Sequence, residues 1–339
     1  MSRWPIRVVA PAVWAVALVG WLVLGDFSVQ RFTVVFWVVT ALVAFTVGRL
    51  PWWRAPLDWA PFIVFFLAYD YTRGAASMLG FPTHWELPAR IDRMLGIGEV
   101  PSVWLQEHLS ARYDAVPWWE SITSIVYVSF FIVPIVLAGV LWMRSRPQFV
   151  RFMTRLMLVS AIALVGYVGV PAAPPWAAAR CTHAEVVDHP RDPVCMADNH
   201  PSDRGDTVLR RIHPENEFSP IVRRISTRGF RDIPGMQLTG GFIKSGIDAS
   251  NPLAAVPSLH GAVALLVSVF LWPLVRRRWR PLLALYPLAM GFSLVLGGDH
   301  YVFDILLGWG LVAAVVAMLS RLERRPARQE ELEPAMAVA

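Results

Sequence analysis

The chain has 339 residues, of which 55% are hydrophobic and only 17% are charged, whereas soluble globular domains carry about 25% charged residues. This composition excludes an ordinary soluble protein and indicates a membrane protein with several spans. The net charge of +6 comes almost wholly from arginine, because Lys244 is the only lysine. The basic residues fall mostly between apolar runs, so we interpret them as topology signals and expect no nucleic-acid partner.

Eight apolar segments approach the roughly 20 helical residues that a bilayer crossing requires. The expected spans are 8–25, 32–48, 57–72, 118–142, 152–170, 258–275, 281–298 and 301–320. Several of them are short, so the predicted number of spans lies between six and eight. No small-residue cleavage site follows the first segment, and we expect a retained span there instead of a signal peptide. The predicted fold class is therefore all-α, a polytopic membrane helix bundle.

Arginine clusters follow the second, fourth, sixth and eighth expected spans, which places all of them on one side of the membrane. By the positive-inside rule this side is cytoplasmic, and so are both termini. The segments 73–117 and 171–257 then lie outside the cell. We expect interfacial amphipathic helices within 81–117 and a long irregular extracytoplasmic loop over 171–257. The strong bias for arginine over lysine is typical of a GC-rich bacterial genome, which makes the predicted location a bacterial cell membrane.

The chain divides into three predicted parts. Residues 1–56 form N-terminal spans, residues 57–320 form the functional membrane domain, and residues 321–339 form a cytoplasmic tail. The tail is highly charged and contains no aromatic residue, so we expect it to be disordered. The sequence makes no prediction about the oligomeric state.

Two apolar stretches carry ionisable side chains at the same expected edge of the membrane. "GGDHYVFDILLGWG" (297–310) places His300 and Asp304 one helical turn apart, and "AAVPSLHGAVALL" places His260 in the first turn of the span 258–275. Each feature alone could be an interfacial polar residue or a mutual hydrogen bond between side chains. Their occurrence on one predicted face favours a functional site, since ionisable groups are costly within a bilayer.

These residue types suit phosphoryl transfer through a covalent intermediate. Asp304 can accept a hydrogen bond from one ring nitrogen of His300, which fixes the tautomer and supports the cation formed on attack. His260 can donate a proton to the departing alkoxide. Ser258 lies at the start of a helix, where backbone N–H groups and the helix dipole favour an anion.

"PSLH" and "GDHYVFD" resemble the second and third signature motifs of the type 2 phosphatidic acid phosphatase superfamily, integral-membrane branch. Together with "PAAPPW" (171–176) and "YDYTRG" (69–74), they resemble the inositol-phosphorylceramide synthase (aureobasidin-resistance) branch and its bacterial relatives. The resemblance implies that His300 is the nucleophile that forms a phosphohistidine, that Asp304 orients it, and that His260 protonates the leaving group. It also implies that no metal or other cofactor is used.

The sequence departs from the phosphatase pattern in two places. The Ser-Arg pair that precedes the third-motif histidine is replaced by Ser293 and Leu294, and the first motif, a lysine followed seven residues later by Arg-Pro, is absent. Another cation must neutralise the phosphate, and Arg73 is the leading candidate because the expected topology brings it to the same face. Arg73 could instead mark a span end or pair with Asp70. Lys244 is a weaker candidate.

The outer loop contains the only two cysteines, Cys181 and Cys195. Its extracytoplasmic location favours a disulfide between them. Free thiols remain an alternative, and so does a zinc site that would include His183, His189 and His200.

The residues therefore predict a membrane lipid phosphotransferase that moves a phosphorylated head group, with a phospholipid or an isoprenoid phosphate as substrate. A lipid-phosphate or polyprenyl-pyrophosphate phosphatase, in which water is the acceptor, shares the first half-reaction. Two hypotheses from other classes stay open at this point. His260 and His300 could be axial haem ligands in an electron-transfer protein, or the buried charges could line a transport pathway.

Overall fold

The structure is a computed structural model of the chain, and it describes residues 4–24, 31–51, 53–75, 81–110, 116–196, 205–214, 221–231 and 255–336. Over these residues the regular structure is helical, and the β-type pairing consists of isolated bridges between His84 and Ala172 and between Thr182 and Thr207. The predicted all-α fold class is confirmed.

The long helices coincide with the eight predicted apolar segments. They are α1 (Trp4–Leu24), α2 (Arg31–Thr46), α3 (Arg54–Ala75), α6 (Trp118–Arg144), α7 (Arg146–Gly169), α12 (Leu259–Leu271), α13 (Arg280–Leu296) and α14 (Val302–Met336). The shorter elements are α4 (Leu87–Leu95), α5 (Pro101–Leu109), α8 (Pro175–Ala178), α9 (His183–Asp188), α10 (Val208–Ile212) and the 3-10 turns η2 (Val194–Met196), η3 (Arg228–Phe230) and η4 (Arg277–Trp279).

In the part of the chain that the structure describes, four helical stretches are long and apolar enough to cross a membrane. They are α6, α7, Arg277–Leu296, which contains α13, and Val302–Glu323 within α14. This makes the chain a membrane protein. Ile6–Trp21, Val35–Thr46 and Leu259–Leu271 are also apolar but shorter than 18 residues. The predicted number of spans therefore stays a prediction, because these helices fall short of the roughly 20 residues that cross a bilayer core.

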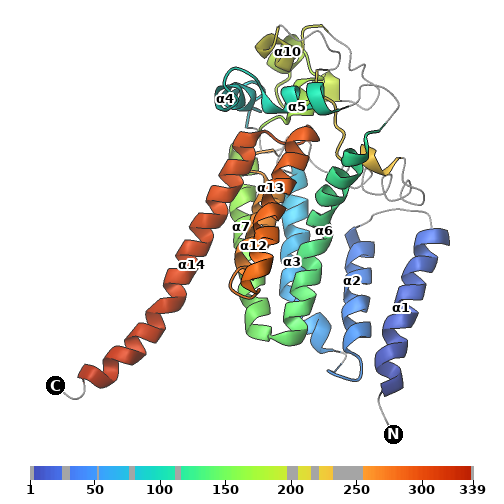
Figure 1. Cartoon of the computed structure of the whole chain (residues 1–339), viewed down its shortest axis with the longest axis vertical. Coiled ribbons are helices and arrows are strands. Elements are labelled where there is room, and N and C mark those ends of the chain that lie inside the picture. Colours follow the sequence, from blue (N-terminus) through green and yellow to red (C-terminus); the bar gives the residue numbers. More distant parts are fainter. Residues whose placement is uncertain are drawn as a thin grey trace.

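The long helices run side by side, and α4, α5 and α10 gather at one end of them (Figure 1). The start of α1 and the far end of α14 lie at the opposite end (Figure 1). Both ends of the described chain thus lie at one end of the bundle (Figure 1). The compartment that each end faces stays a prediction.

The two largest clusters of buried hydrophobic side chains in the described residues lie at different heights of the bundle. The first lies between the long helices and is mostly aliphatic, with an aromatic group in which the ring centroids of Trp59 and Trp142 are 6.4 Å apart, edge to face, and those of Trp59 and Phe149 are 5.0 Å apart. The second cluster lies among α4, α5, α8 and α10 and includes Trp85, Val100 and Leu209. The short helices at this end therefore form a packed outer cap over the bundle.

Cys181 and Cys195 are joined by a disulfide within the outer cap, with their Cα atoms 5.2 Å apart. Both residues are fully buried. Sulfur atoms bonded to each other cannot act as thiolate ligands, so this arrangement leaves no cysteine for the zinc site considered above. Of the three histidines of that alternative, His200 lies outside the described residues.

Residues 321–336 continue α14 as a helix up to Met336, which differs from the predicted disordered tail. The prediction used only charge and the lack of aromatic residues. Glutamate, arginine, glutamine, leucine and alanine all have high helix propensity, and extending an existing helix needs no new nucleus. A polar segment can therefore remain helical where it follows an apolar one.

Candidate active site

Ser258 is the N-cap residue of α12. Its Oγ accepts a hydrogen bond from the N–H of Gly261 at 3.3 Å, and its own N–H donates to the carbonyl oxygen of Asp304 at 2.9 Å. Ser258 is fully buried. This second hydrogen bond joins the start of α12 to the first turn of α14, so the two helices enter the bundle together.

A glycine allows α12 and α14 to approach this closely. A Cβ atom on Gly308 would lie 2.4 Å from the carbonyl oxygen of Ser258, a distance that atoms in contact do not reach. Only a residue without a side chain fits there. The close approach places His260, at the start of α12, beside the residues that precede α14.

The structure brings the two predicted histidines together. The ring centroids of His260 and His300 are 5.6 Å apart, and the ring planes are tilted by 57°. Nδ1 of His300 lies 3.4 Å from Oδ2 of Asp304, which is an ion-pair distance and does not meet the geometry of a hydrogen bond. His300 is 6% exposed and Asp304 is fully buried. Since Nδ1 faces the carboxylate, Nε2 is the nitrogen of His300 that is directed to other partners.

His260 lies against the aromatic side chains of α6, a contact that sequence reasoning missed. Its ring stacks on Tyr127 with centroids 5.2 Å apart and planes at 19°, and the centroid of Phe130 is 4.1 Å away. The spacing of these residues in an apolar span gave no sign of this role, since aromatic residues occur throughout the span. The two rings fix the orientation of the His260 imidazole.

The turn before His300 is covered by residues 221–226 of the outer cap. The N–H of Ile225 donates to the carbonyl oxygen of Gly297 at 3.1 Å. Gly298 has φ of +74°, and a Cβ atom there would lie 2.7 Å from the carbonyl oxygen of Arg223. A glycine is therefore required both by the left-handed backbone and by the covering segment.

Asp299, the residue before His300, anchors the same segment. Its carboxylate pairs with Nε of Arg224 at 2.8 Å and accepts a hydrogen bond from Ser226. The Arg224 guanidinium also lies 5.1 Å over the ring of Trp176, and the backbone N–H of Trp176 donates to the carbonyl oxygen of Gly298 at 3.1 Å. "PAAPPW" and the turn before His300 are thus in direct contact, and an arginine that sequence reasoning missed lies beside them.

The structure describes the side chain of neither predicted phosphate-binding cation, Arg73 or Lys244. Arg73 belongs to the last turns of α3, whose C-terminal end lies at the same end of the bundle as the outer cap (Figure 1), but its side chain lies outside the described residues. Lys244 lies outside them as well. Within the described ranges, no group of three or more His, Cys, Asp or Glu side chains is arranged to hold a metal ion.

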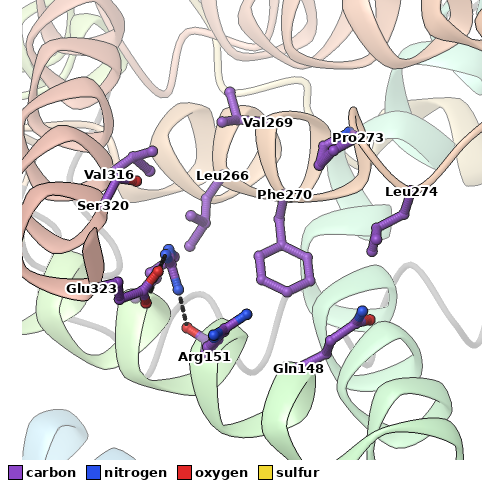
Figure 2. A pocket seen from close by; sticks show the side chains of 11 residues that line it. Gln148, Arg151, Leu266, Val269, Phe270, Pro273, Leu274, Val316, Ser320 and Glu323 are labelled. Carbon is purple, nitrogen blue, oxygen red and sulfur yellow. Dashed lines mark hydrogen bonds and ion pairs between the residues drawn. The ribbon is translucent and has the colours of Figure 1, made fainter. Parts of the chain in front are cut away.

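A cavity of about 250 Å³ lies elsewhere, among α7, α12 and α14, and contains none of the predicted site residues (Figure 2). Figure 2 shows Leu266, Phe270 and Glu323 beside it. Arg155 also lines this cavity, and its Nη2 lies 3.1 Å from Oε1 of Glu323. Arg155 and Glu323 pair with each other there, and we assign the candidate chemistry to the histidine pair.

The family model of the PAP2 superfamily matches residues 89–318, more than half of the chain. The chain belongs to the PAP2 superfamily. The match covers the Ser258–His260 and His300–Asp304 regions and the outer segments packed on them. No curated protein and no solved structure matches the chain.

Members of the PAP2 superfamily are phosphatases or phosphotransferases, so this chain is an enzyme of that type that acts on phosphate esters. The family assignment and the geometry concern the same place in the fold. His260, His300 and Asp304 meet where α12 and α14 begin, next to the outer cap.

Proposed function

We propose that this PAP2-superfamily enzyme is a membrane lipid phosphotransferase that moves a phosphorylated head group through a phosphohistidine on His300, on the extracytoplasmic face. The observation that carries the proposal is the 5.6 Å separation of the His260 and His300 rings, with Asp304 on Nδ1 of His300. This arrangement supplies a nucleophile, its orienting carboxylate and a second imidazole for proton transfer.

In the first half-reaction, Nε2 of His300 attacks the phosphorus of the donor lipid. A P–N bond forms and the P–O bond to the lipid alcohol breaks, while His260 gives its proton to the departing oxygen. The attacked imidazole becomes cationic, and Asp304 holds the Nδ1 proton and stabilises that charge. The product is the free lipid alcohol, with the phosphorylated head group on His300.

In the second half-reaction, a hydroxyl group of the acceptor replaces the lipid alcohol. His260, now neutral, removes the hydroxyl proton while the oxygen attacks phosphorus, and the P–N bond breaks. Both histidines return to their starting protonation states. The same residues therefore serve both directions of transfer, and only the identity of the attacking oxygen separates a transferase from a phosphatase.

The phosphate must meet positive charge or N–H groups at the mouth of α12. Ser258 begins this helix, and the N-terminal end of a helix favours an anion. We retain Arg73 as a proposed phosphate ligand because it ends α3 on the same side of the bundle. An arginine in this role would replace the arginine that is absent at Leu294.

Two observations support a transferase of the inositol-phosphorylceramide synthase type over a phosphatase. The residue that replaces the phosphatase arginine is Leu294, which is fully buried and apolar. His300 is only 6% exposed, because the outer cap covers the turn that carries it. Limited access of water favours an acceptor hydroxyl that is delivered by a lipid.

The test uses purified protein in lipid nanodiscs, a phospholipid labelled in its head group and a hydroxyl-bearing acceptor lipid, with an isoprenoid phosphate as a second donor. Transfer of the label to the acceptor lipid, and its loss in His300→Ala, would support the proposal. Release of the labelled phosphorylated head group into water at the same rate without an acceptor lipid, or of inorganic phosphate from the isoprenoid phosphate, would favour the phosphatase. Neither transfer nor release from any donor would refute both.

A further inference from the structure

The first turn of α14 is bound by a carboxylate from a distant part of the chain. Asp92 of α4 accepts hydrogen bonds from the N–H of Val302 at 3.1 Å and from the N–H of Phe303 at 2.9 Å, one on each carboxylate oxygen. The preceding N–H, that of Tyr301, donates to Asp304 at 3.0 Å. Three successive N–H groups after His300 are therefore held by two carboxylates.

Asp92 is fully buried, and the described residues show no ion pair for it. The arginines of its own helix are directed elsewhere, since Arg90 pairs with Glu86 and Arg93 donates to the carbonyl oxygen of Gly98. Burying an unpaired carboxylate is costly. Ala89 of the same helix belongs to the apolar cluster of the outer cap, and an apolar side chain at position 92 would avoid this cost if packing were the only requirement.

We infer that Asp92 is a positioning residue for the reaction: through its two hydrogen bonds to the start of α14 it fixes His300 and Asp304 relative to His260. A side chain of the outer cap thereby becomes part of the catalytic assembly. The inference rests on the proposed function, because it assigns Asp92 to the alignment of the same nucleophile.

The chemistry of the helix end supports a positioning role. The first N–H groups of a helix lack partners within the helix, and a carboxylate supplies them while it interacts favourably with the helix dipole. Burial raises the pKa of Asp92 to about 6, with the backbone hydrogen bonds opposing this rise and the nearby Asp304 carboxylate adding to it. The fold thus keeps a carboxylate at a position that disfavours its charge.

The α14 N-terminus has little capacity left for a phosphate, because its first amides already bind Asp92 and Asp304. The corresponding end of α12 has Ser258 as its cap and no such pair of carboxylates in the described contacts. The two helix ends then differ in task. The α12 end receives the anion, and the α14 end holds the nucleophile in place.

The experiment measures kcat and KM for head-group transfer in Asp92→Asn and Asp92→Ala, with activity normalised to folded protein. Asparagine keeps one acceptor oxygen and alanine keeps none, so kcat should fall in the order wild type, Asn, Ala, with a loss of about tenfold or more for alanine. KM should stay unchanged, because Asp92 does not touch the substrate. The matched control is Glu86→Gln, a carboxylate-to-amide change at the N-cap of the same helix, where the side chain is partly exposed.

Wild-type kcat in both Asp92 variants would overturn the inference. Amide hydrogen exchange supplies a readout that needs no activity. In Asp92→Ala the amides of Val302 and Phe303 should both exchange faster, and in Asp92→Asn at least one of them should, while those of α12 should keep their protection. Unchanged exchange at these two amides would also overturn it. If wild-type protein shows no transfer yet the exchange changes as expected, the proposed function fails and the contact itself stands.

Discussion

The separation of α12 and α14 at Gly308 can be perturbed by a single methyl group. In Gly308→Ala the new Cβ would lie 2.4 Å from the carbonyl oxygen of Ser258, whereas ordinary contact begins at 3.4 Å. The two backbones must therefore move apart by ~1 Å, the difference between these distances. Ser258 is two residues before His260, and Gly308 is on the helix that follows His300, so the displacement acts on the alignment of the two histidines.

A misplacement of ~1 Å at a catalytic group lowers a rate by about 100-fold. We expect kcat for head-group transfer to fall by about this factor in Gly308→Ala, and overpacking to cost about 1–3 kcal/mol of stability. The matched control is Gly310→Ala, two residues further along the same helix, where a Cβ would meet nothing within 4 Å. That control should keep its activity and gain slightly in stability, because alanine is the better helix former.

The assay combines head-group transfer in nanodiscs with thermal unfolding of both variants. Reduced transfer by folded Gly308→Ala, alongside normal transfer by Gly310→Ala, is the expected outcome. Wild-type transfer by Gly308→Ala would refute the reasoning, since it would mean that the tight contact between α12 and α14 does not determine how the histidines are aligned.

Three further predictions concern single side chains. Asp304→Asn should slow formation of the phosphoenzyme at least about tenfold in rapid-quench measurements, because an amide stabilises the His300 cation poorly. The midpoint of thermal unfolding should not fall, and a normal rate of phosphoenzyme formation would show that Asp304 has no part in the mechanism. His260→Ala should impair donors with alkoxide leaving groups far more than aryl phosphates, whose leaving groups need no proton; equal losses would show that His260 is not the acid. Burial raises the pKa of Asp92 from 3.8 to about 6, so the folded state binds this proton more tightly than the unfolded state does. The free energy of unfolding that this proton contributes is present at low pH and is lost as the pH rises through about 6. The stability difference between wild type and Asp92→Asn should therefore fall by up to about 3 kcal/mol between about pH 4 and pH 7 in chemical denaturation, and a difference that does not change with pH would contradict this assignment.

Helix positions were predictable from the sequence because a bilayer imposes long apolar runs. The expected segment 118–142 corresponds to Trp118–Arg144, and the segment 281–298 corresponds to Arg280–Leu296. The meeting of His260 and His300 at one end of the bundle followed from the same pattern, because both residues enter their helices from the same expected side. The pattern did not predict how far apart the two imidazole rings lie. Their 5.6 Å separation depends on Gly308, which contacts Ser258, a residue 50 positions earlier in the sequence.

The polar supports of the site could not be predicted in the same way. Asp92 lies 210 residues from Val302, and Arg224 lies 75 residues from Asp299. In the sequence both belong to polar outer segments, where a charged residue normally indicates solvent exposure. Only the packing of the outer cap on the bundle shows that Asp92 is buried and that Arg224 lies beside the turn before His300. The assignment of phosphate binding to Arg73 stays a prediction.

The central claim is that His300 carries the phosphorylated group during turnover, and it is tested most directly by trapping the phosphoenzyme. Purified protein would be mixed with donor lipid, quenched at alkaline pH to preserve a P–N bond, digested and analysed by mass spectrometry. The account predicts an adduct of the phosphorylated head group on His300 that disappears in His300→Ala and accumulates when the acceptor is withheld. An adduct on any other residue, or turnover that persists in His300→Ala, would contradict it.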